Sequence, residues 1–194
     1  AEALLAGGAA ALAELAARPW PRAVFIGSGT ALGAALESSL KLLEMTDGAI
    51  VTRAEEVLGI RHGPLAALTD DTLVVLLAST SPYRRRYEAD LLRQLHTQAL
   101  GGRRVVVGWG LDPAWGEMCH LALELAPPGA GGAGGAPSPP DDLLAPLLVL
   151  PGQLLGLFAS LALGLAPDNP SRRGAIHRVV QGVTIHPYPG RACS

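Results

Sequence analysis

Short apolar runs alternate with longer amphipathic stretches along this chain. Five runs bounded by turn residues are expected to be strands: residues 23–26, 49–53, 72–78, 104–108 and 121–125. Helical patterns occupy residues 2–17, 31–45 and 83–100. The run at 72–78 is apolar almost throughout, which is typical of a central parallel strand. The alternation predicts a three-layer α/β/α fold with a doubly wound, five-stranded parallel sheet.

The pattern within residues 31–45 also predicts which face of that helix is buried. Leu32, Leu36, Leu40 and Leu43 recur at helical spacing. We expect this leucine stripe to face the core.

Two segments interrupt the regular pattern. Residues 127–140 are rich in Pro, Gly and Ala and are expected to form a flexible loop. Residues 143–167 carry no charge, so hydropathy alone would permit a membrane span, but internal prolines favour a buried or subunit-interface helix. We expect a helix and linker at 1–19, one domain at 20–189 and a tail at 190–194, with no membrane partner.

Composition and charge narrow the class of partner. Hydrophobic residues make up 49% of the chain, and the net charge of -2 gives no electrostatic footprint for nucleic acid. Cys119 and Cys193 have neither metal-ligand spacing nor the pattern of a disulfide framework. We therefore expect no metal and no cofactor, and a reducing cytoplasm as the location.

The turn after the first expected strand is a candidate anion site. Gly27-Ser28-Gly29-Thr30 places free backbone N–H groups and two hydroxyls at a helix start. The alternative is close packing alone, with Thr30 as the helix N-cap. A dinucleotide fingerprint is incomplete, because Leu32 stands where the third glycine is required.

Two titratable side chains are candidates for proton transfer. Glu44 lies in the last helical turn, where the helix dipole helps keep a carboxylate basic. The alternative is an ordinary charged stripe of Glu37, Lys41 and Glu44. His62, in a loop, is either a proton shuttle for a sugar ring oxygen or a surface residue. The arginines at 84–86 are expected to form a solvated helix face, with one phosphate contact as the alternative.

Several motifs occur in an order that resembles one family. The segments LKLLE, RHGP, ALGLAPDNP and RVVQGVTI resemble the second sugar isomerase (SIS) module of the tagatose-6-phosphate ketose/aldose isomerase family, which includes galactosamine-6-phosphate deaminases. The resemblance covers residues 20–126 and 143–189. It implies a flavodoxin-like SIS fold, a hexose or hexosamine 6-phosphate as the ligand, and proton transfer between C1 and C2 of the opened sugar.

The resemblance also implies roles for individual residues. The glutamate of the LKxxE motif, here Glu44, is the base. The histidine of the HGP motif, here His62, assists ring opening in the neighbouring subunit, which implies a homodimer or a second SIS module. Glucosamine-6-phosphate synthase, a related enzyme, uses a tail lysine that Gln181 replaces here, so an imine route through that lysine is closed. The expected substrate contacts are Gly27, Ser28, Gly29, Thr30, Ser79, Thr80 and Gln181.

The loop after the third expected strand departs from the family pattern. Ser79-Thr80-Ser81 lacks the glycine and the trailing threonine of the SxSGxT-like loop that grips the phosphate in the first module. We therefore expect the catalytic-carboxylate half of a phosphosugar isomerase or aminosugar-phosphate deaminase. The alternatives are a non-catalytic sugar-phosphate sensor and a structural half that dimerises through the helix at 143–165.

Overall fold

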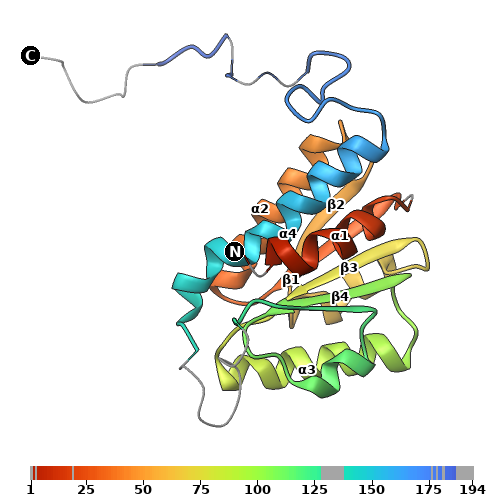
Figure 1. Cartoon of the computed structure of the whole chain (residues 1–194), viewed down its shortest axis with the longest axis vertical. Coiled ribbons are helices and arrows are strands. Elements are labelled where there is room, and N and C mark those ends of the chain that lie inside the picture. Colours follow the sequence, from red (N-terminus) through yellow and green to blue (C-terminus); the bar gives the residue numbers. More distant parts are fainter. Residues whose placement is uncertain are drawn as a thin grey trace, which may run out of the picture.

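Five parallel strands form one sheet through the middle of the molecule (Figure 1). The computed structural model describes residues 2, 4–18, 20–127, 138–175, 177, 179–180 and 182–186. The strands are β1 (Arg22–Gly27), β2 (Val51–Glu56), β3 (Thr72–Leu77), β4 (Arg103–Gly108) and β5 (Leu121–Glu124). Their spatial order is β2-β1-β3-β4-β5, and each neighbouring pair is parallel. The predicted doubly wound sheet is confirmed.

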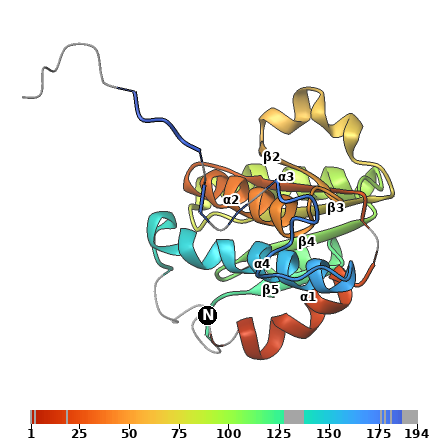
Figure 2. The ribbon, with the colours of Figure 1, turned by 90° about the horizontal axis from the view of Figure 1, so that it is seen from above.

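Helices cover both faces of this sheet, as Figures 1 and 2 show. One face carries η1 (Leu4–Gly8), α1 (Ala9–Ala16), α2 (Thr30–Met45) and α4 (Asp141–Ala162). The other carries α3 (Pro82–Thr97) and the short helices η2 (Gly59–His62), η3 (Pro64–Ala67) and η4 (Pro113–Glu117). The three-layer α/β/α arrangement is therefore as predicted.

β3 is the central strand, and it is buried on both faces of the sheet. All six of its residues are buried, and successive side chains point to opposite faces. Val75 and Leu77 pack with α1, α2 and α4, whereas Val74 and Leu76 pack with α3. A strand buried on both sides requires the continuous apolar run that the sequence shows.

The leucine stripe of α2 does not face the core, contrary to the prediction. Leu36, Leu40 and Leu43 are 57%, 44% and 37% exposed. The buried face of α2 consists mostly of small residues: Ala31, Ala34, Ala35, Ser38, Ser39 and Leu42. These side chains let α4 approach so closely that a Cβ added to Gly152 of α4 would lie 2.3 Å from the Cβ of Ser38. Close helix–helix packing therefore decides which face of α2 is buried.

After the two aspartates at its start, α4 carries no charged residue, and it packs against both α1 and α2. Leu144, Leu148 and Leu155 are at most 1% exposed. The helix is long and apolar enough to cross a membrane by length and composition, and 44% of its most apolar window is buried inside the protein. The predicted helix is confirmed over residues 141–162, with Pro146 and Pro151 inside it, and one side of it is buried against α1 and α2.

Candidate functional site

The order of the strands reverses at β1, and such sheets bind ligands where the order reverses. β2 lies on one side of β1 and β3 on the other, so the loops that leave β1 and β3 diverge beyond the carboxyl ends of these strands. Gly27 is in register with Leu77, which brings residues 27–30 next to residues 79–81. The two loops expected to contact the substrate therefore lie at one edge of the sheet.

Close packing shapes the turn after β1. Gly29 has a φ of 57°, in the left-handed region, and a Cβ on Gly27 would lie 2.5 Å from the carbonyl oxygen of Ala31. Thr30 is not the N-cap of α2, because Gly29 holds that position. The Thr30 hydroxyl instead donates to Asp142 at the start of α4. The alternative in which Thr30 caps the helix is therefore wrong.

Ser28 connects this turn to the end of β2. Its hydroxyl donates to Glu56 Oε1 at 2.8 Å, while Glu56 Oε2 accepts the N–H groups of Leu58 at 2.6 Å and Gly59 at 3.0 Å. Burial raises the pKa of Glu56, but these hydrogen bonds outweigh it and leave the pKa below its ordinary value. The ionised carboxylate thus ties the glycine turn to η2, the short helix that ends at His62.

An aspartate at the start of α4 accepts hydrogen bonds from the loop after β3. Asp141 Oδ2 accepts from Ser79 Oγ at 2.6 Å and from Arg84 Nη1 at 2.8 Å. Its Oδ1 accepts the Thr80 N–H at 2.6 Å. The same oxygen lies 2.8 Å from Thr80 Oγ1, whose proton can go instead to the carbonyl of Pro139. Sequence reasoning missed Asp141, although an aspartate pair opening an apolar helix was a visible signal.

A buried glutamate accepts a hydrogen bond from the same loop. Glu88 of α3 is fully buried, and its two carboxylate oxygens lie 3.0 and 3.2 Å from the Ser79 nitrogen, which donates to them. Burial raises the pKa of Glu88 to about 7, although the Ser79 hydrogen bond and the charge of Arg85 act in the opposite direction. The Ser79 N–H is thereby engaged within the protein.

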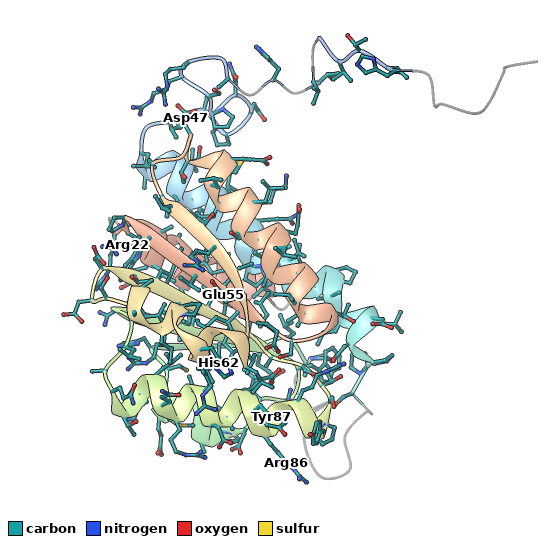
Figure 3. All side chains as sticks on the ribbon, turned by 180° about the vertical axis from the view of Figure 1, so that it is seen from behind. Arg22, Asp47, Glu55, His62, Arg86 and Tyr87 are labelled. Carbon is teal, nitrogen blue, oxygen red and sulfur yellow. The ribbon has the colours of Figure 1, made fainter. Side chains whose placement is uncertain are left out.

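The arginines at 84–86 form the expected solvated face only in part, because Arg84 and Arg86 are exposed whereas Arg85 is half-buried. Arg84 pairs with Asp141. Arg85 donates to the carbonyl of Ser79 at 2.6 Å and to the carbonyls of Gly110 and Trp109. Arg86 is exposed and points away from the body of the protein (Figure 3). Two of the three arginines therefore contribute to the edge of the sheet where the loops after β1 and β3 lie, called the carboxyl edge below.

Glu44 lies at the other end of α2. The helix begins at the glycine turn, and its rise of about 1.5 Å per residue puts Glu44 roughly 20 Å from Thr30. The side chain is 34% exposed, and its Oε2 lies 2.8 Å from Lys41 Nζ, which is 3.7 Å from Glu37 Oε1. Hydrogen bonding to Glu44 raises the pKa of Lys41. The charged stripe is thus present, and it lies far from both loops of the carboxyl edge.

His62 is exposed at the end of η2, on the α3 side of the sheet. Arg61 donates from Nε to Gln94 Oε1 of α3 at 2.9 Å, which anchors η2. Figure 3 shows His62 well separated from Asp47, which follows α2. Within one chain, the two candidate proton-transfer groups are therefore not brought together.

Among the described residues, a small hollow of about 100 Å³ lies just beyond the end of α2, between Thr46, Asp47 and Arg172, and two larger hollows lie elsewhere. One of about 330 Å³ lies between α1 and the strands β4 and β5, and another of about 280 Å³ lies between α1, residues 49–50 and the end of α4. The lining of neither includes an expected site residue. In the part of the chain that the structure describes, no three His, Cys, Asp or Glu side chains are grouped as metal ligands. Gln181 lies outside the described residues.

Known proteins resemble this chain over most of its length. The D-galactosamine-6-phosphate deaminase AgaS of Escherichia coli O157:H7 is 37% identical over 170 residues, which cover 88% of this chain and 42% of that protein. The glutamine–fructose-6-phosphate aminotransferase of Methanothermobacter thermautotrophicus is 31% identical over 149 residues, 75% of this chain and 22% of that protein. The crystal structure of tagatose-6-phosphate ketose/aldose isomerase from Escherichia coli matches with a TM-score of 0.77 at 30% identity, over 95% of this chain and 45% of that one.

The chain thus spans less than half the length of these relatives. Its fold agrees with that of the tagatose-6-phosphate ketose/aldose isomerase structure over 95% of the chain. A family model described as the SIS domain matches residues 17–126, which is more than half of the chain. The chain therefore belongs to the SIS domain family.

Proposed function

We propose that this chain is the catalytic-carboxylate module of a phosphosugar isomerase or aminosugar-phosphate deaminase. The names of its relatives, a galactosamine-6-phosphate deaminase and a tagatose-6-phosphate isomerase, support this class of substrate. The observation that carries the proposal is the Glu44 carboxylate, which Lys41 Nζ holds at 2.8 Å at the accessible end of α2. Isomerisation and deamination both begin with removal of a proton next to a carbonyl, so one base serves either reaction.

The chemistry follows from the position of that proton. Glu44 takes the proton from C2 of the opened aldose and returns it to C1 through an enediol. With a 2-amino sugar the intermediate is an enolamine, and the C2 imine that results is hydrolysed to a ketone and ammonia. Lys41 keeps the carboxylate in one orientation, and His62 of a neighbouring copy carries a proton to and from the ring oxygen.

The distance along α2 makes this a composite site. Roughly 20 Å of helix between Thr30 and Glu44 is longer than a hexose 6-phosphate, so one substrate cannot reach both ends of α2. We infer that Glu44 faces a second SIS module, from another copy or from a longer protein. The exposed Leu36, Leu40 and Leu43 lie beside Glu44, and a module packed on them would exclude water from around the carboxylate.

The test follows proton exchange from solvent. The chain is incubated at high concentration with galactosamine 6-phosphate or tagatose 6-phosphate in D₂O, and deuterium at C1 or C2 is followed by NMR beside ammonia release. Glu44→Gln should lower exchange by about 10²–10⁴-fold, the usual contribution of a positioned base. Glu37→Gln is the matched control, because Glu37 contacts the same Lys41 from one turn earlier. We expect it to change the rate by only a few-fold.

Three results would change this proposal. Equal losses in the two variants would show that Glu44 acts only through the charged stripe. Sugar-phosphate binding without exchange in the unaltered chain would favour the non-catalytic sensor. Efficient turnover by the chain as a demonstrated monomer would refute the composite site.

A further inference from the structure

Four hydrogen-bond donors at the carboxyl edge converge on a single anion. They are Ser79 Oγ, the Thr80 N–H, Thr80 Oγ1 and Arg84 Nη1, and together they are called the anion seat below. All four lie within hydrogen-bond distance of the carboxylate of Asp141, although the Thr80 hydroxyl can donate to Pro139 instead, and the Asp141 side chain is only 8% exposed. Both oxygens of the carboxylate are engaged.

The seat is built from several elements rather than from one helix end. Arg84 lies over the glycine turn of β1, since a Cβ on Gly29 would be 2.9 Å from the guanidinium carbon. The Ser79 N–H is turned away to Glu88, and the Ser81 N–H donates to Ser79 Oγ at 2.9 Å, which orients that hydroxyl. The Ser79 hydroxyl is thus oriented by a contact other than Asp141, and Arg84 is placed beside the glycine turn.

The donor set suits a phosphate oxyanion as well as a carboxylate. Hydroxyls, a backbone N–H and an arginine fork are the groups that bind both kinds of anion in proteins. Burial raises the pKa of Asp141, but hydrogen bonds from Ser79, Thr80 and Arg84 outweigh it, so the group stays ionised at neutral pH. While Asp141 is ionised, a second anion is excluded because the position is occupied and because Asp141 carries a like charge.

We propose that the loop after β3 is an oxyanion-binding site that the chain fills with its own Asp141 carboxylate, and that inorganic phosphate binds there once this carboxylate is removed. In the native chain the seat holds the start of α4 against the sheet instead of holding a ligand. The phosphate of a substrate is then bound elsewhere, by a different module. This inference goes beyond the proposed function and does not depend on it, because its test requires no turnover.

The experiment compares phosphate binding by the unaltered chain and by Asp141→Ala, using isothermal titration calorimetry and chemical-shift changes in ³¹P NMR. We expect Asp141→Ala to bind inorganic phosphate at least tenfold more tightly than the unaltered chain. The matched control is Asp90→Ala, which removes an exposed carboxylate from α3 and changes the net charge equally. It should leave phosphate binding unchanged.

A second substitution locates the site. Adding Arg84→Ala to Asp141→Ala should return phosphate affinity to that of the unaltered chain, because the arginine fork is lost. Should Asp141→Ala fail to fold by circular dichroism, Asp141→Ser replaces it, since serine is favourable at a helix start. The proposal is wrong if the folded variants bind phosphate no better than the unaltered chain, or if Asp90→Ala gains as much.

Discussion

The close contact of α2 with α4 predicts opposite effects for two glycine substitutions. A Cβ on Gly152 of α4 would lie 2.3 Å from Ser38 Cβ, 2.4 Å from its Oγ and 2.8 Å from its Cα. A Cβ on Gly33 of α2 would meet nothing within 4 Å. Both glycines are inside helices, so both replacements by alanine gain the same helix propensity.

The two variants therefore differ by the cost of the contact alone. The propensity gain is about 1 kcal/mol, and Gly33→Ala should raise the free energy of unfolding by this amount. Overpacking costs about 1–3 kcal/mol, and the backbone atom in the contact puts Gly152→Ala at the upper end. We expect Gly152→Ala to be roughly 2 kcal/mol less stable than the unaltered chain after the propensity gain, which lowers the Tm by about 4–8 °C for a domain of this size.

Urea unfolding followed by circular dichroism measures both free energies, provided that the slope with urea is unchanged. The double variant Gly152→Ala with Ser38→Gly removes the Cβ and Oγ contacts and should recover part of the loss. If Gly152→Ala proves as stable as Gly33→Ala, the helices are free to separate, and the explanation given for the buried face of α2 fails.

Two further predictions concern buried polar groups. The pKa of Glu88, about 7 against an ordinary 4.5, means that the folded state keeps a proton that the unfolded state loses, so this group's contribution to stability falls as pH rises from about 4.5 to 7. Glu88→Gln should lose that dependence, so its free energy of unfolding should rise relative to that of the unaltered chain by up to about 3 kcal/mol between about pH 4.5 and 7. Urea titrations at a series of pH values measure this difference. Parallel pH profiles of the two proteins would contradict the prediction. Among the described residues, the Ser38 hydroxyl is buried without a hydrogen-bond partner, so Ser38→Ala should raise the free energy of unfolding by about 1 kcal/mol. Ser39→Ala, which loses a hydrogen bond to Thr52, should lower it in the same assay, and a loss in both would show that Ser38 has a partner.

The strands were predictable because each one is decided locally. The run at β3 is apolar on both faces, and only a central parallel strand requires that pattern. β2 was the least accurate, since it continues through Glu55 and Glu56 beyond the expected end. A strand at the edge of the sheet tolerates charged side chains, and the Glu56 carboxylate is used there to bind Ser28.

The buried face of α2 was not predictable from its own periodicity. Its sequence contains two faces at helical spacing, one of leucines and one of small residues. The choice between them depends on Gly152 and Gly156 of α4, where added Cβ atoms would lie within 3.3 Å of α2. That information is more than a hundred residues away, and no local pattern connects the two helices.

The residue that occupies the anion seat was not predictable either, because it lies far away in the sequence. Asp141 is separated from Ser79 by 62 positions in the sequence. The sequence shows that the loop after β3 departs from the family pattern, but the missing glycine and threonine do not show which residue fills the space. The arginines at 84–86 were equally ambiguous, because a charged run on a helix looks the same whether it meets water or a buried carbonyl.

The acidic groups at the carboxyl edge and at the far end of α2 differ in whether their carboxylates are used within the chain. At the carboxyl edge, Asp141, Asp142 and Glu56 accept the hydrogen bonds of the loops where a ligand would be expected. At the far end of α2, Glu44 keeps its carboxylate one-third exposed beside an apolar strip. A module whose anion seat is filled internally and whose candidate base faces outward cannot hold one sugar phosphate at both points. If both proposals hold, the base and the phosphate-binding groups of one active site come from different modules, and a monomer of this chain should not catalyse proton transfer.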